Sequence, residues 1–116
     1  MSAFAGVART VAASVARYGQ SATYVSASGA RTTLSVLPTG SAALSREETD
    51  QGEYQVQRRS VYVLAADIPS IDTRDAVLLF DGESWVSWIV TGGQSDGAAG
   101  HVVSLERREL INRRRL

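Results

Sequence analysis

The chain has 116 residues, twelve arginines against twelve acids, no lysine and no cysteine. A chain of this length forms one domain and buries roughly two-thirds of the surface of its unfolded state, which allows a modest core. The lack of cysteine excludes disulfides, thiolate nucleophiles and cysteine-based metal sites, and the longest apolar run, 61–66, is too short to span a bilayer.

The net charge of zero hides an uneven distribution along the chain. Residues 1–46 carry four arginines and no acid, a charge of +4, and residues 47–106 carry eleven acids against three arginines, a charge of −8. Residues 107–116 carry five arginines against one acid, a charge of +4. Such an asymmetry of charge influences association and the choice of partner, and it does not indicate the fold.

The first predicted element is a helix over residues 3–18. Apolar side chains from Phe4 to Tyr18 recur at spacings of three and four residues, which is typical of one face of a helix. Gly19 follows, where helices commonly end on a left-handed residue. This apolar stripe either packs on a sheet, the commoner outcome, or docks on a partner.

After the helix the apolar period changes to two, which indicates strands. The first two strands are predicted at 22–26 and 32–38, with a turn around Gly29. The segment 39–53 is small, polar and acidic, so we predict a long mobile loop there.

Four more strands are predicted in the second half of the chain, at 54–64, 76–80, 83–91 and 101–109. A bulge is expected near Arg58 and Arg59, a two-residue Asp81–Gly82 turn joins the hairpin, and 92–100 is a glycine-rich turn. One helix and six adjacent strands predict a mainly β fold. We expect a single domain over 1–116: an antiparallel barrel or sandwich with an N-terminal helix, the polar loop and a flexible basic tail at 110–116.

The sequence offers little for catalysis. His101 is the single histidine, and we expect it on the surface of a strand. Asp72 and Asp75 could act as paired acids, but at a junction between a loop and a strand they more commonly bind backbone amides. The glycine-rich segment lacks the pattern of a phosphate-binding loop. We therefore predict no catalytic, cofactor-binding or metal-binding residues.

Two tryptophans point to opposite faces of one predicted strand. Trp88 shares a face with Val86 and Val90, whereas Trp85 shares the other with Ile89. If one face is core, the other exposes Trp85 and Ile89, and such patches often mark interfaces. If barrel and helix bury both faces, the pattern carries no functional meaning.

A resemblance to a known family rests on the order of these motifs. A helix ending at "RYG", the strand "ATYVS", a long polar loop and "SVYVLAADIPSIDTRDAVLLFDGESWVSWIV" precede a final strand that runs into "INRRRL". This arrangement resembles the head–tail joining (head–tail attachment or connector) proteins of tailed bacteriophages, the lambda-attachment-protein-like family. The hairpin of 71–90, with Gly82, Trp85 and Val86, carries most of the likeness.

The resemblance implies a structural virion protein and not an enzyme. Members of that family are barrels that assemble in the host cytoplasm into rings of roughly six or twelve copies, between the portal or adaptor and the tail terminator or tube. DNA passes through such a ring without sequence recognition, and no membrane is involved. Subunit contacts would then use Trp85, Ile89, Arg58 and Arg59.

The resemblance also suggests roles for the charged segments. The loop residues Arg46, Glu47, Glu48, Asp50, Gln51, Gly52 and Glu53 would line or plug the ring lumen, or form a solvated loop without a role. The tail residues Asn112, Arg113, Arg114, Arg115 and Leu116 would bind an acidic groove on a neighbouring component. DNA is the alternative partner of this tail.

Three other functions stay open at this point. A tail-completion or tail-terminator ring that caps the tail tube would use similar motifs. A nucleic-acid-binding β-barrel is less favoured, because the acidic centre opposes DNA and aromatic and basic residues do not alternate. An enzyme is the least favoured.

Overall fold

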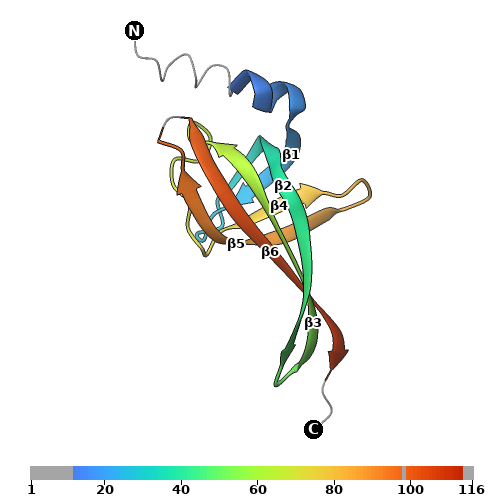
Figure 1. The fold of residues 1–116 in the computed structure, drawn as a ribbon. Helices are drawn as coiled ribbons and strands as arrows, with labels where there is room; N and C mark the ends of the chain where they lie inside the picture. The colour runs from blue at the N-terminus through green and yellow to red at the C-terminus, as the bar shows by residue number, and fades with distance from the viewer. Residues whose placement is uncertain (1–11, 98, 114–116) are drawn as a thin grey trace.

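The chain folds as a closed antiparallel barrel with a helix at one end (Figure 1). The computed structural model describes residues 12–97 and 99–113. Residues 12–18 are helical, and the six strands are β1 Gln20–Val25, β2 Arg31–Thr49, β3 Gly52–Leu64, β4 Ala76–Phe80, β5 Trp85–Ser95 and β6 Gly100–Arg113. They close in the order β1-β2-β3-β6-β5-β4. The predicted mainly β fold with an N-terminal helix is confirmed.

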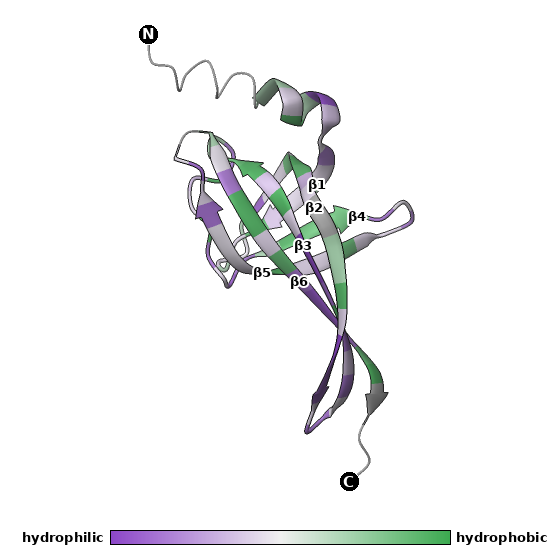
Figure 2. Cartoon of the chain, in the orientation of Figure 1, coloured by the Kyte–Doolittle hydropathy of each residue, from purple (hydrophilic) through white to green (hydrophobic). Residues whose placement is uncertain are grey.

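The barrel interior is filled by alternate residues of the strands, as the two-residue period of a strand requires. Val61 of β3 lies opposite Val103 of β6, and both are fully buried. The core comprises Ala22, Tyr24, Leu34, Val36, Val61, Val63, Ile68, Val77, Leu79, Trp88, Val90, Val103 and Leu105. Apolar colour accordingly concentrates on the barrel strands in Figure 2.

The helix lies at one end of the barrel, where Val15 is buried. Of the predicted helix, residues 3–11 lie outside the described residues, and Tyr18, placed on its apolar stripe, is 67% exposed. Gly19 does not adopt the predicted left-handed conformation. It is needed for close approach instead, because a Cβ there would lie 2.2 Å from the Val15 carbonyl oxygen. The Gly19 N–H donates to that same oxygen at 2.8 Å.

The predicted mobile loop at 39–53 is wrong. β2 and β3 stay paired as far as Thr49 and Gly52, so only the turn residues 50–51 lie between them. β6 pairs with β3 over the same length, up to Arg113 opposite Gly52. Residues 110–113 are therefore strand and not a flexible tail.

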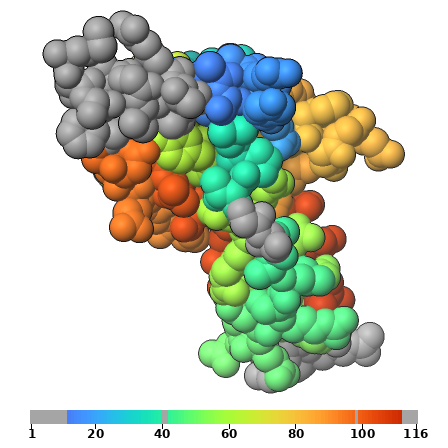
Figure 3. Space-filling model, turned by 45° about the horizontal axis from the view of Figure 1, so that its top comes forward, coloured from blue at the N-terminus to red at the C-terminus, as the bar shows by residue number. Residues whose placement is uncertain are grey.

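These strand extensions form a three-stranded arm, which we define as residues 43–49, 52–58 and 106–113. The arm projects from the barrel at the end opposite the helix (Figures 1 and 3) and gives the molecule extents of 64 × 26 × 26 Å. The polar sequence of 39–49 has no apolar periodicity, so the sequence alone did not predict a strand there. Pairing with β3 makes this segment a strand.

A bulge lies where the barrel passes into the arm. Thr39 pairs with Ser60 and Ala43 with Arg58, so residues 40–42 of β2 face Arg59 alone. The predicted bulge is therefore present at this level, but its extra residues lie on β2 and not on β3. Bulges bend a strand and increase its twist, which suits a place where a closed sheet opens.

Two predicted turns differ in length from the observed ones. The β4–β5 turn spans the four residues 81–84, so that Phe80 pairs with Trp85. Oδ1 of Asp81 accepts the N–H groups of Glu83 and Ser84, at 2.8 and 2.9 Å. β5 continues to Ser95, which leaves residues 96–99 as the turn before β6 instead of the predicted 92–100.

Candidate interaction surfaces

An apolar patch lies on the outer wall of the barrel. Phe80, Trp85 and Ile89 are 43%, 51% and 56% exposed, and we call them the barrel-wall patch. Trp88 and Val90 of the same strand face the core. The alternative in which one face of this strand exposes Trp85 and Ile89 is therefore the observed one.

Phe80 was missed as a member of this patch. Its ring centroid lies 5.5 Å from that of Trp85, an aromatic contact formed directly across the β4–β5 ladder. The predicted two-residue turn would have placed Glu83 opposite Phe80 and concealed this contact. The side chain of Asp81, which binds two amides of the turn, was the signal for a longer connection.

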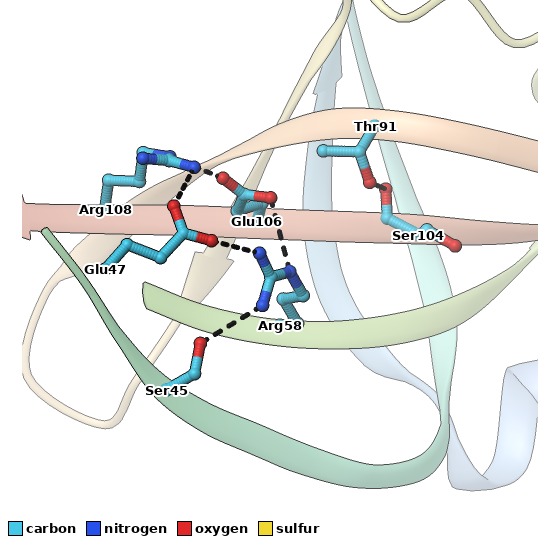
Figure 4. Close-up of polar contacts among 7 residues, drawn as sticks. All are labelled: Ser45, Glu47, Arg58, Thr91, Ser104, Glu106 and Arg108. Carbon is cyan, nitrogen blue, oxygen red and sulfur yellow. Dashed lines mark hydrogen bonds and ion pairs between the residues drawn. The ribbon is translucent and has the colours of Figure 1, made fainter. Parts of the chain in front are cut away.

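Four charged side chains link the three strands of the arm (Figure 4). We call Glu47, Arg58, Glu106 and Arg108 the ion network. Glu47 bridges to Arg58 at 2.9 Å and to Arg108 at 2.6 Å. Glu106 closes the network, with Arg108 at 2.6 Å and Arg58 at 3.5 Å. Arg58 also donates to Oγ of Ser45 at 3.1 Å.

The ion network gives Glu47 a stable charge. Hydrogen bonds from Arg58 and then from Arg108 lower the pKa of the Glu47 carboxyl. Glu106 and then Glu47 raise the pKa of the Arg108 guanidinium. Val56, between Ser45 and Arg108 in the ladder, is fully buried on this face although it lies outside the barrel core. We attribute its burial to the side chains of the network around it.

The predicted acidic loop residues lie along the arm and at its tip. Asp50 and Gln51 form the turn, and Gly52 has a φ of 143°. Glu53, like Glu47, is paired within the chain, because it bridges to Arg46 at 3.4 Å. Glu48, opposite Glu53 in the ladder, is exposed. Internal pairing reduces the net negative charge that this segment presents to its surroundings.

The two arginines predicted at the subunit interface have different surroundings. Arg58 is part of the ion network, on the outer row that contains Glu106 and Ile89. Arg59 pairs with the buried Leu105 instead, and its guanidinium lies 5.6 Å from the centroid of the Trp88 ring. Arg58 is therefore accessible beside the barrel-wall patch, whereas Arg59 caps the core where the arm begins.

The predicted C-terminal binding tail is only partly described. Asn112 and Arg113 belong to β6, where they pair with Glu53 and Gly52 of β3. Arg114, Arg115 and Leu116 lie outside the described residues.

Asp75 connects the loop that follows β1 with the loop that precedes β4. It is 5% exposed and accepts hydrogen bonds from the Tyr24 hydroxyl, from Ala27 N at 2.9 Å and from Asp72 N at 3.0 Å. Burial, followed by the hydrogen bond to Asp75, raises the pKa of Tyr24 above its ordinary value. Both Asp75 and Asp72 bind backbone amides, as the structural interpretation predicted.

Asp72 and His101 complete the predicted chemical candidates. The Arg74 guanidinium, which binds Asp72 at 2.8 Å, lowers the pKa of that carboxyl to about 2. His101 is half-buried at the start of β6 and not on the open surface, and its Nε2 has no hydrogen-bond partner among the described residues. Within residues 12–97 and 99–113, no three His, Asp or Glu side chains cluster as metal ligands, and no helix could cross a membrane.

Fold and surfaces together define a closed six-stranded barrel with a polar arm at one end and an apolar patch on its wall. The chain matches no known family model and no curated protein.

Proposed function

We propose that this chain is a structural virion protein of the tailed-phage neck, a ring subunit that joins the DNA-filled head to the tail. The proposal is carried by one observation: the molecule has two unlike exposed surfaces, the barrel-wall patch and the arm, on different parts of a closed body. A ring subunit that joins two components requires a lateral contact, which repeats from copy to copy until the ring closes, and a separate axial surface for the adjoining component.

The barrel-wall patch has the composition of a subunit contact. Two aromatic side chains and one isoleucine are exposed on one wall, beside the charged row of Arg58 and Glu106. Aromatic anchors next to a polar rim are typical of protein interfaces. On an isolated barrel these side chains would stay in water, which disfavours a monomer as the working form.

The arm supports contact along the ring axis. It extends beyond the barrel as a paired sheet, so a neighbouring ring would meet a preformed surface, and little ordering entropy is lost on binding. The guanidinium groups of the arginines at 113–115 can each bind a carboxylate through two hydrogen bonds, which suits an acidic groove on a portal, an adaptor or a tail protein. A tail-completion ring would use the same two surfaces.

The test removes the barrel-wall patch while the core is kept. We expect Trp85→Ser with Ile89→Ser to abolish ring formation in analytical ultracentrifugation, and particles with this variant to accumulate as separate heads and tails. Ser87→Thr, on the same exposed face of β5, is the matched control and should assemble normally. Electron microscopy of virion necks then locates the protein. A wild-type chain that stays monomeric and is absent from purified particles would contradict the proposal.

A further inference from the structure

The arm has two sheet edges that the barrel does not close. β1 pairs with β2 only over residues 31–36, and β5 pairs with β6 only as far as Glu106. In the part of the chain that the structure describes, no strand pairs with the outer edge of β2 over residues 43–49 or of β6 over 107–113. Both edges therefore present backbone N–H and C=O groups without a strand partner.

Such edges are normally protected in soluble proteins, because they template pairing with another chain. Neither 43–49 nor 107–113 contains a proline, and the charged side chains that both edges carry are a protection that an edge of opposite charge can neutralise. Exposed apolar side chains lie on both edges: Leu44 is 61% exposed, Leu110 38% and Ile111 41%. Strand addition from another molecule would satisfy the backbone groups and cover part of this apolar surface.

We propose that neighbouring copies join arm to arm, with the β6 edge of one copy paired to the β2 edge of the next. This inference rests on the proposed function, because a ring subunit must repeat one heterologous contact. Both β2 and β6 run antiparallel to β3, so they are parallel to each other within the arm. Copies related by rotation about a ring axis, with their arms along it, would therefore form a parallel β6–β2 pair and a continuous sheet.

The charges of the two edges favour this pairing over a symmetric one. The β6 edge, 107–113, carries three arginines and one glutamate, +2 in all, whereas the β2 edge, 43–49, carries one arginine and two glutamates, −1 in all. A β6–β6 or β2–β2 contact would bring together edges of like charge, while β6–β2 brings together opposite charges.

The ladder also gives the register of the contact. Arg46 and Glu109 both pair with Gln55 of β3, so they lie at the same level on opposite edges of the arm and on the same face. Rotation about an axis along the arm adds no shift along it. Glu109 of one copy would then lie beside Arg46 of the next, and the two form an opposite-charge pair across the new ladder.

Disulfide trapping tests the contact directly, because the chain has no cysteine of its own. The variant carries Arg46→Cys and Glu109→Cys. Within one copy β3 separates the two positions by roughly two strand spacings, about 9.6 Å. That exceeds the reach of a disulfide, about 7 Å between Cα atoms. Every disulfide in this variant must therefore join two copies. Oxidation is carried out on concentrated protein and on assembled particles, followed by non-reducing electrophoresis.

We expect a ladder of covalent multimers that ends at the ring size, with at least a tenfold lower yield for Leu44→Cys with Glu109→Cys. This control places the two cysteines two levels apart on the same face, which is too far for a disulfide. The single variants Arg46→Cys and Glu109→Cys should stay monomeric on the gel. Circular dichroism and thermal melting of each variant verify that it folds.

The possible results separate this inference from the proposed function. Dimers from either single variant would overturn the heterologous contact in favour of symmetric edges. Rings or particles that contain the double variant without any cross-link would overturn edge pairing while the neck function stands. A full ladder from a protein that is absent from virion necks would support the arm contact and overturn the neck function.

Discussion

The barrel and the arm bury a valine of the same strand in contrasting ways. Val61 and Val56 of β3 are both fully buried. Val61 belongs to a continuous apolar core closed by six strands, whereas Val56 lies in a three-stranded sheet on the face of four charged side chains. Two valines of one strand are therefore buried by different means, apolar packing in the barrel and charged side chains in the arm.

The barrel and the arm should respond differently to solution conditions. Apolar burial is non-directional and depends little on pH, so the barrel should persist over a wide range. Exposed ion pairs are screened by salt and depend on ionised carboxylates. We infer that the arm opens locally before the barrel unfolds, as regions of low apolar contact commonly do.

Asp75→Ala should have the largest effect, because it removes buried hydrogen bonds at the barrel. The substitution removes the acceptor for the Tyr24 hydroxyl and for two backbone amides, in a site that is 5% exposed. Buried donors without partners are costly, so the free energy of unfolding should fall by about 2–4 kcal/mol in urea titrations. Asp81→Ala, which removes an exposed acceptor of two turn amides, is the control and should cost much less. Equal losses in the two variants would show that burial of Asp75 contributes nothing.

Substitutions of Val61 and Val56 should have intermediate effects, and they test the barrel and the arm within one strand. Val61→Ala should lower the free energy of global unfolding by about 2 kcal/mol, from lost burial and the cavity left in the core. Val56→Ala should leave the global transition almost unchanged and instead increase hydrogen exchange of the arm amides. Identical shifts of the urea midpoint in both variants would mean that arm and barrel unfold as one unit.

The smallest effect concerns Glu47 and acid. Because the pKa of Glu47 is lowered in the folded chain, its ion pairs stabilise the arm fully above the ordinary pKa of 4.5. This stabilisation is lost as pH falls through the lowered value. Arm amides should therefore broaden or shift in NMR spectra in acid, and Glu47→Gln should weaken this response. Glu109→Gln, outside the ion network, is the control. An arm that is unaffected by acid and by about 1 M salt would contradict the role of the network.

Several parts of the fold could be predicted from local sequence. The turn at Gly29 and the strands with β-branched or aromatic residues, such as 54–64 and 76–80, appear where the two-residue period indicated them. Exposure of Trp85 and Ile89 followed from the same period once one face was core. Asp72 and Asp75 bind amides, as their place before a strand indicated.

The errors share one physical cause. The strand pairing of 39–49, the length of β6 and the ion network depend on residues far apart in the chain, such as Glu47 and Arg108. The polar segment 39–49 has no apolar periodicity, so it can be identified as a strand only from its pairing with β3. Gly19 was predicted to be a left-handed helix end from its position after the helix. Instead, a glycine is needed there because the Val15 carbonyl oxygen lies too close for a Cβ.

Local sequence patterns were sufficient to predict a cysteine-free, mainly β domain with a helix before its strands, because alternation and turn residues act over a few neighbours. Only the tertiary structure shows that the sheet closes and that its polar middle extends as an arm. It also shows that no strand among the described residues pairs with the two outer edges of this arm. These features depend on strand pairing between residues far apart in the sequence, which no local pattern encodes.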